Sequence, residues 1–325
     1  GDDLVVGGDI DLEGAIDVNG TANLDIVDVD GAVNFAADVT YADGADIITA
    51  SAGTSNFRAG VNAGNTIESG GNYNVVVGDE AGTAITTGDN NTAIGYAALD
   101  ANTTASDNTA VGYASLGANT TGIRNVAVGA TALDANTTGY DNIGVGVASL
   151  GVHTTGYANI AIGSYALDAN TTANHNIGIG RYALSSNTTG ASNTAIGNDS
   201  LAANTTASNN TAVGATALDA NTTGTENVAV GAGALTANTT GSYNHAFGRN
   251  AGAAITTGAT NIAIGNAALS TATTADGNTA IGHNTLAANT SGASNVAVGA
   301  NALDANTSAS NNTAVGYAAL TANTT

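Results

Sequence analysis

A short aliphatic pattern recurs along most of the chain at a fixed spacing. The motif Asn-x-Ala-Val/Ile-Gly begins at Asn74 and returns every 17 residues up to Asn312, with no insertion or deletion, which gives 15 copies. Ordinary domains tolerate loop insertions, so an unbroken period indicates units that stack identically on their neighbours. Helical repeats need longer units. The period therefore predicts an all-β fold, a parallel β-solenoid or β-roll with one 17-residue coil per repeat.

The first five positions of the repeat predict a short strand that ends in a glycine. With the motif Asn as position 1, position 5 is Gly in every copy, and position 4 is Val, Ile or once Phe247. Position 3 is Ala or Gly in every copy but the first, which has Val76. A Gly required in every coil indicates a positive φ or a backbone too crowded for a Cβ. Positions 2 to 4 carry no charge, so we expect one strand face in the coil interior and the other against another chain.

Positions 9 and 12 of the repeat change together. Position 9 is Leu in 13 copies, but the copies with Gly82 and Gly252 instead have Ile85 and Ile255 at position 12, which is Asn in most others. A close-packed interior demands such conservation of volume, so both positions are expected to point into the same space. Asn at position 12 is then expected to form a ladder of amides between coils about 4.8 Å apart.

The other positions divide into one that is constant and several that vary. Position 13 is always Thr and is expected to close a turn, while positions 6, 7, 10, 16 and 17 vary freely and predict an exposed ridge. Several Tyr residues recur on this ridge: Tyr96, Tyr113 and Tyr317 at position 6, and Tyr140, Tyr157 and Tyr243 near the end of the repeat. Exposed rings are typical either of stacking on surface polysaccharide or of packing across coils or chains.

The N-terminal part of the chain has a different pattern. Residues 4–12 and 24–29 alternate apolar with acidic side chains between glycines, which predicts half-buried strands. Such short strands cannot fold singly, so residues 1–56 are predicted to form a shaft in which the chains of an oligomer intertwine as a β-prism. Residues 57–73 are interpreted as a degenerate first coil, in which Gly64 and Ile67 repeat the Gly/Ile variant, and residues 74–325 as the fifteen solenoid repeats.

Composition and charge narrow the classes of partner. The 325 residues include 26 acidic and 4 basic side chains, a net charge of −22, and no Pro, Cys, Met or Trp. Such a charge makes nucleic acid and anionic membranes unsuitable partners. No apolar stretch approaches the length of a membrane span, so no membrane insertion is expected. The regular aliphatic placement argues against disorder, the other structure that so biased a composition suggests.

Candidate sites for catalysis, metals and sugars are few. The four histidines fall at different repeat positions, and no Gly-Lys-Ser/Thr motif is present, so neither an enzyme nor a phosphate site is expected. Position 12 Asn followed by Thr-Thr is formally an N-glycosylation acceptor, although an inward Asn is inaccessible. No cofactor is expected. A calcium site is weighed against a solvated acidic strand face, which is favoured, at two groups of carboxylates: Asp9, Asp11 and Glu13, and Asp25, Asp28 and Asp30 before Gly31.

Two segments resemble known fibre families. The runs Leu-Val-Val-Gly-Gly-Asp-Ile and Gly-Ala-Ile-Asp-Val-Asn-Gly-Thr-Ala near the N-terminus resemble shaft sequences of tail fibres from marine tailed phages. Units such as Asn-Thr-Ala-Val-Gly-Tyr-Ala-Ala-Leu resemble repeats of those same fibres and the head repeats of YadA-like trimeric autotransporter adhesins, whose Asn-Ser-x-Ala-x-Gly core builds a left-handed parallel β-roll. The resemblance implies a parallel homotrimer that contacts a host, although a 17-residue period is longer than the usual adhesin repeat.

Three functions follow as hypotheses. The leading one is an extracellular phage tail-fibre shaft, a structural part of the virion that supports attachment to a polysaccharide or protein receptor on the host surface. The alternative is a bacterial or archaeal cell-surface adhesin or extracellular filament subunit, which a membrane anchor or end-to-end polymerisation would favour. The third is an ice-binding solenoid. The adjacent Thr pair at positions 13 and 14 counts against it, because a strand sends neighbouring side chains to opposite faces.

Overall fold

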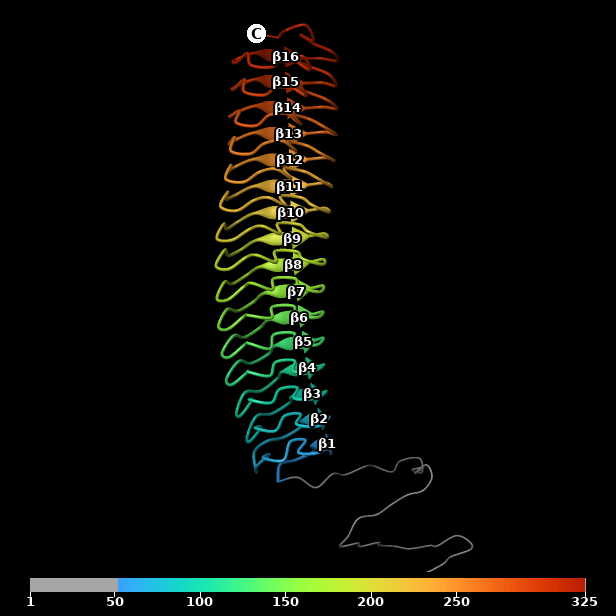
Figure 1. Cartoon of the computed structure of the whole chain (residues 1–325), viewed down its shortest axis with the longest axis vertical. Coiled ribbons are helices and arrows are strands. Elements are labelled where there is room, and N and C mark those ends of the chain that lie inside the picture. The colour runs from blue at the N-terminus through green and yellow to red at the C-terminus, as the bar shows by residue number, and fades with distance from the viewer. Residues whose placement is uncertain (1–51, 325) are drawn as a thin grey trace, which may run out of the picture. The chain divides into compact units, whose positions relative to one another are not determined.

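The computed structural model describes residues 52–324, which lie in the second of the two units of the chain, Ile48–Thr325. These residues form a parallel β-solenoid in which each coil contributes one strand to a single continuous sheet (Figure 1). The predicted all-β solenoid with a 17-residue repeat is therefore confirmed. Residues 1–51 of the predicted N-terminal shaft, and every carboxylate weighed for calcium, lie outside the described residues.

Sixteen strands of three residues each pair in chain order, always in parallel. Equivalent repeat positions lie side by side, as in the pairing of Thr92 with Thr109. The first coil is one residue longer than the others, because Phe57 pairs with Val75. The described residues contain no helix. The strands are β1 (Phe57–Ala59), β2 (Val75–Val77), β3 (Thr92–Ile94), β4 (Thr109–Val111), β5 (Val126–Val128), β6 (Ile143–Val145), β7 (Ile160–Ile162), β8 (Ile177–Ile179), β9 (Thr194–Ile196), β10 (Thr211–Val213), β11 (Val228–Val230), β12 (His245–Phe247), β13 (Ile262–Ile264), β14 (Thr279–Ile281), β15 (Val296–Val298) and β16 (Thr313–Val315).

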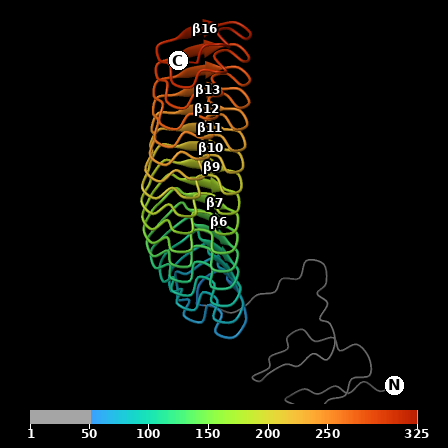
Figure 2. The ribbon, with the colours of Figure 1, turned by 45° about the horizontal axis from the view of Figure 1, so that its top comes forward.

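The interior of the coils is narrow and is filled by small and aliphatic side chains. Of the strand residues, only the one at position 3 points inward, and Ala93 and Ala195 are fully buried there. Because side chains alternate along a strand, positions 2 and 4 point outward, and Ile94 is 38% exposed. The Leu at position 9 fills the rest of the core, as Leu99 does. The strand therefore contributes a small residue, usually Ala, to the core, and its Val or Ile residues lie on the outside of the coil. Figure 2 shows the coils stacked on one another, with the strand of each coil beside the strand of the next.

The Gly at position 5 is required for both of the reasons considered from the sequence. Its φ lies between +127° and +139° in every copy from Gly78 to Gly316, a region that is essentially restricted to glycine. A Cβ on Gly197 would also lie 2.6 Å from the carbonyl carbon and oxygen of Gly214 in the next coil. The backbones of successive coils thus approach too closely here for any side chain.

The predicted exchange between positions 9 and 12 is confirmed. A Cβ on Gly82 would lie 2.8 Å from Cδ1 of Ile85, and one on Gly252 would lie 3.0 Å from the same atom of Ile255. The isoleucine side chain thus occupies the space that Leu fills in other coils. Leu at position 9 adopts a left-handed conformation, with φ +56° at Leu99, which costs roughly 1–2 kcal/mol. Burial of its side chain is what offsets that strain.

Two ladders of asparagine and one of threonine join the coils. The expected ladder at position 12 is present, for example from Asn136 Nδ2 to Asn119 Oδ1 at 2.9 Å. A second ladder at position 1 has the backbone N–H of Asn91 donating to Asn74 Oδ1 at 2.9 Å. The hydroxyl of Thr120 at position 13 donates to the carbonyl oxygen of Thr137 in the next coil at 3.0 Å. Position 13 therefore joins coils, whereas a turn-closing role was expected.

Candidate interaction surfaces

The outward face of the sheet is uncharged over its whole length from β2 to β16. Position 4 is always Val or Ile apart from Phe247, and position 2 is Thr, Val or Ile apart from His245. These side chains are half-buried to exposed, with Ile162 40% exposed and Phe247 42% exposed. The expectation that both strand faces are buried holds for one face only in the single chain. We call the side chains of positions 2 and 4 the strand face.

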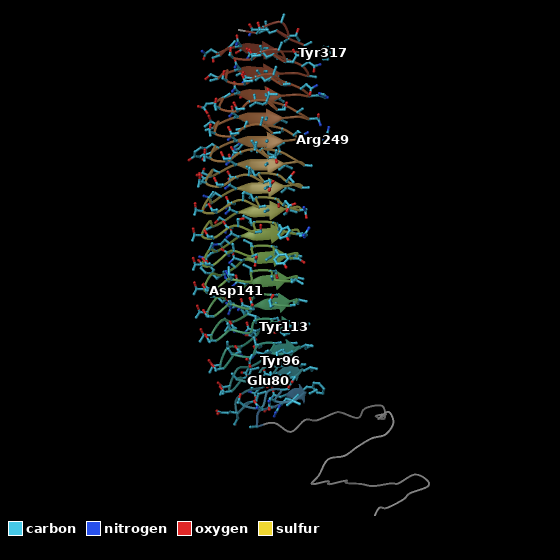
Figure 3. The ribbon with its side chains drawn as sticks, viewed as in Figure 1. Glu80, Tyr96, Tyr113, Asp141, Arg249 and Tyr317 are labelled. Carbon is cyan, nitrogen blue, oxygen red and sulfur yellow. The ribbon has the colours of Figure 1, made fainter. Side chains whose placement is uncertain are left out.

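Charged and aromatic side chains lie at the two edges of the strand face. Tyr96, Tyr113, Arg249 and Tyr317 at position 6 follow the ends of the strands along one edge, whereas Asp141 at position 17 lies on the opposite side (Figure 3). At that second edge, Arg124 binds Asp141 of the next coil through two hydrogen bonds of 2.6 and 2.9 Å. The hydrogen bond from this guanidinium lowers the pKa of the Asp141 carboxyl. Positions 6 and 17 of the predicted ridge are mostly exposed and lie on opposite sides of the strand face, whereas positions 7, 10 and 16 are mostly half-buried.

The tyrosines of neighbouring coils stack on one another. The ring centroids of Tyr140 and Tyr157 lie 4.9 Å apart with parallel planes. Two further pairs stack in the same way: Tyr96 with Tyr113 at 5.6 Å, and Tyr165 with Tyr182 at 5.4 Å. In each stacked pair, each ring covers one face of the other ring, so less aromatic surface is left for a sugar to stack on. Of the two interpretations of the tyrosines, packing between coils therefore describes these three pairs.

Aspartates at position 10 alternate with glycine in part of the solenoid. Asp134 and Asp168 lie two coils apart, and Gly151 occupies this position in the coil between them. A Cβ on Gly151 would lie 2.9 Å from Asp168 Oδ1, so the carboxylate leans over the preceding coil. Partial burial raises the pKa of both carboxyls. The Gly between them keeps two partly buried carboxylates from lying next to each other in successive coils.

The histidines do not converge. His153 is fully buried at position 12, whereas His175, His245 and His283 are exposed at three other positions. Within residues 52–324, no group of three or more His, Cys, Asp or Glu side chains could hold a metal ion. The formal N-glycosylation sites at position 12 from Asn102 to Asn306 are inaccessible in the folded coil, because these asparagines are fully buried. No helix in the described part of the chain is suited to crossing a membrane.

His153 replaces an asparagine within the position 12 ladder. Its Nε2 lies 2.9 Å from the carbonyl oxygen of Gly156, which asparagine Nδ2 contacts at equivalent positions. Its Nδ1 lies 3.3 Å from both Nδ2 and the backbone carbonyl oxygen of Asn170, and in a neutral ring protonated on Nε2 it accepts from Nδ2. Asn136 Oδ1 in the preceding coil consequently has no hydrogen-bond donor. Desolvation lowers the pKa of His153.

The position 1 ladder was missed from the sequence, although a signal was present. Asn at position 1 is invariant, and Asn91 also donates from Nδ2 to the carbonyl oxygen of Ala105 at 2.9 Å, which ties the two ends of one coil together. Constancy alone could have predicted a buried amide at this position. No known family model, no curated protein and no solved structure matches this chain.

Proposed function

We propose that the chain is the shaft of an extracellular fibre, of the phage tail-fibre type, built as a parallel homotrimer that projects from a virion and supports attachment to a host surface. The observation that carries the proposal is the uncharged, half-exposed strand face. A soluble chain rarely leaves so continuous an apolar strip uncovered. Intertwined N-terminal strands within residues 1–56 would begin the shaft in this proposal.

The strand face is uncharged and has the area to contribute to association between copies. Sixteen strands about 4.8 Å apart span roughly 75 Å, and three residues span roughly 10 Å, so each face offers on the order of 750 Å². Stable protein interfaces bury about 800 Å² per partner. Each copy carries a net charge of −22, so copies repel one another unless they meet where no charge lies. The strand face carries no charge, and in a trimer its area is divided between two partners, so it supplies roughly half of the standard contact area with each.

The interior of the solenoid suits a structural role. Hydrogen bonds run from coil to coil at positions 1, 12 and 13, and equivalent backbone groups pair around the rest of the coil. Such stacking makes each coil depend on its neighbours and gives a stiff one-dimensional array. A cell-surface adhesin or filament subunit would use the same array and is the alternative proposal. Neither role requires catalysis.

The strand face can be tested by adding charge to it. Ile162→Asp with Ile196→Asp places two carboxylates on the strand face at position 4. The matched control, Ser192→Asp with Asn209→Asp, adds the same charge at exposed position 17. Sedimentation over a dilution series is expected to show the strand-face variant dissociating toward the monomer of about 31.1 kDa at a higher concentration than the control, because the N-terminal shaft holds both trimers equally. If the two variants dissociate alike, the strand face is not part of the interface.

Ice binding is a second candidate, and one observation favours it. Positions 2 and 4 are two residues apart, point outward and repeat in register across the sheet, as Thr194 and Ile196 do with Thr211 and Val213. The objection based on the adjacent Thr pair does not apply to this face. Ice and a second chain compete for the strand face, so this function requires a monomer. A monomer that inhibits ice recrystallisation, and loses this activity in Thr194→Lys with Thr211→Lys, would favour ice binding over the fibre.

A further inference from the structure

The fifteen copies of the repeat can be aligned with one another, and one exposed position carries a hydroxyl residue in every copy. Position 14 is Thr in 13 copies and Ser in the other two, Ser291 and Ser308. Every described residue at this position is exposed. The nearby positions 16, which is mostly half-buried, and 17, which is mostly exposed, have diverged to Asp, Ser, Tyr, Asn, Arg and others. The repeats have therefore had time to diverge, and position 14 has been held constant.

The hydroxyl at position 14 has no role inside the solenoid. Thr188 at position 13 donates to the carbonyl oxygen of Thr205 at 3.0 Å, whereas no hydrogen bond among the described residues involves the hydroxyl of Thr189 or of its equivalents at position 14. Its backbone N–H does bond the next coil, but any residue except proline can supply that group. Folding therefore uses the backbone at this position and leaves the hydroxyl free.

The hydroxyl is the property that the two residue types share. Ser291 and Ser308 lack the β-branch and the methyl group of Thr, so neither strand propensity nor packing explains the restriction. Solubility does not explain it either, because Asn, Asp and Gly are common in the chain and never occur at this position. Thr and Ser share an aliphatic hydroxyl, which can accept a transferred group in an enzyme-catalysed reaction at neutral pH.

We propose that the position 14 hydroxyls carry O-linked sugars. In the transfer, the hydroxyl oxygen bonds to the anomeric carbon of a nucleotide-activated sugar, the bond from that carbon to the phosphate breaks, and the hydroxyl proton passes to a base of the transferase. Exposure gives the transferase access, and no internal hydrogen bond is lost. The result is a row of sugars along the solenoid, one site per coil about 4.8 Å apart.

The negative charge of the chain favours a neutral sugar over a phosphate as the group attached to the position 14 hydroxyls. Each phosphate would add about −1.5 to −2 charges at neutral pH, next to another phosphate about 4.8 Å away and on a chain of net charge −22. A neutral sugar adds no charge and increases hydration. The sugars would occupy position 14 and leave positions 2 and 4 uncovered. The modification goes beyond the proposed fibre role and does not depend on the oligomeric state.

The test is the intact mass of the chain produced in its natural source, compared with the chain from cell-free synthesis without sugar donors. The natural chain is expected to show a series of masses separated by single sugar residues, with fragmentation placing them at position 14. A variant with Thr121, Thr138, Thr155 and Thr172 changed to Val should lose up to four sugars. The matched control changes four exposed or half-exposed strand-face hydroxyls to Val, at Thr92, Thr109, Thr194 and Thr211, and should lose none.

Three results would overturn the proposal. They are an unmodified mass in the natural source, mass increments of phosphate instead of sugar, or sugars placed at other residues, such as the exposed Asn90 and Asn209. None of these results would bear on the proposed interface at the strand face, because that proposal is tested separately by the oligomeric mass.

Discussion

At the scale of single residues, backbone conformation limits the sequence more than side-chain chemistry does. Glycine at position 5 and leucine at position 9 both have positive φ, but only the glycine lies where any Cβ would meet the backbone of the next coil. Leucine tolerates its conformation because a side chain of its size is needed in the core. This difference explains why position 5 never varies, while position 9 is Leu in 13 copies and Gly in two.

Gly197→Ala is expected to loosen the solenoid locally. Its φ of +137° and the 2.6 Å approach to Gly214 together cost at least about 1–3 kcal/mol. Hydrogen exchange in the coils on either side of Gly197 should therefore be faster by roughly 5- to 150-fold. Gly117→Ala is the matched control, because position 10 is Ala in other copies and φ at Gly117 is not positive. Equal exchange rates in the two variants would contradict the account.

His153 should make the solenoid sensitive to mild acid. Burial lowers its pKa in the folded chain, so the unfolded chain binds the proton more readily below the ordinary value of 6.5. The stability that comes from keeping the ring neutral is present above pH 6.5 and is lost as the pH falls toward the lower folded-state pKa. When the pH is lowered from 7.5 to 5.5, the urea concentration at the midpoint of unfolding should fall more for the wild type than for His153→Asn. The asparagine does not titrate, and it also supplies a donor for Asn136 Oδ1. His283→Asn, at an exposed position, should behave like the wild type.

At the scale of the coil, packing at positions 9 and 12 works as one unit. Leu235→Gly should open a cavity and cost about 2–5 kcal/mol, and Asn238→Ile alone should overpack the space that Leu235 fills. The double variant recreates the arrangement of Gly252 and Ile255 in the next coil. Its loss of stability should be smaller than the sum of the single losses by at least about 1 kcal/mol in a double-mutant cycle. Additive losses would show that the two positions do not share one space.

The two neighbouring threonines of a coil should differ in their effect on stability. Thr188→Val removes the hydroxyl bond to Thr205 and leaves a carbonyl oxygen with one partner fewer, at a cost of about 0.5–1.5 kcal/mol. Thr189→Val removes a hydroxyl that bonds nothing inside the chain, so urea unfolding should be almost unchanged. A similar loss for both variants would assign position 14 a structural role.

Some of the coil was predictable from the sequence, and the rest was not, for physical reasons. The exchange of Leu and Asn for Gly and Ile predicted a shared space, because interior volume must be conserved. The strand was harder, since a run of Thr, Ala and Val has no polar residue to mark its outer face. Only the coil geometry shows that Ala93 points inward and Ile94 outward. The invariance of Asn at position 1 and of Thr at position 13 indicated a structural role, but it did not predict which hydrogen bonds Asn91 and Thr120 form.

At the scale of the whole molecule, the placement of charge is the main constraint on assembly. The charged residues of the solenoid lie mostly at positions 6, 7, 10, 16 and 17, and the strand face from β2 to β16 has none. Copies that carry −22 each therefore repel one another least where uncharged surfaces meet, and the strand face is the apolar one of these surfaces. The exposure of positions 6 and 17 was predictable from their variability. The stacking of tyrosines between coils was not, because it depends on the axial spacing of the coils.

The most direct test of the proposed fibre is the native mass of the unmodified chain by light scattering, with its length measured by electron microscopy of the same sample. We expect a particle of about 93 kDa, three times 31.1 kDa, that contains a solenoid segment about 75 Å long. Three copies at this length would mean that the strand face is covered by identical chains. A particle of 31.1 kDa with the same length would contradict the fibre, because a single chain would then leave its strand face open in solution.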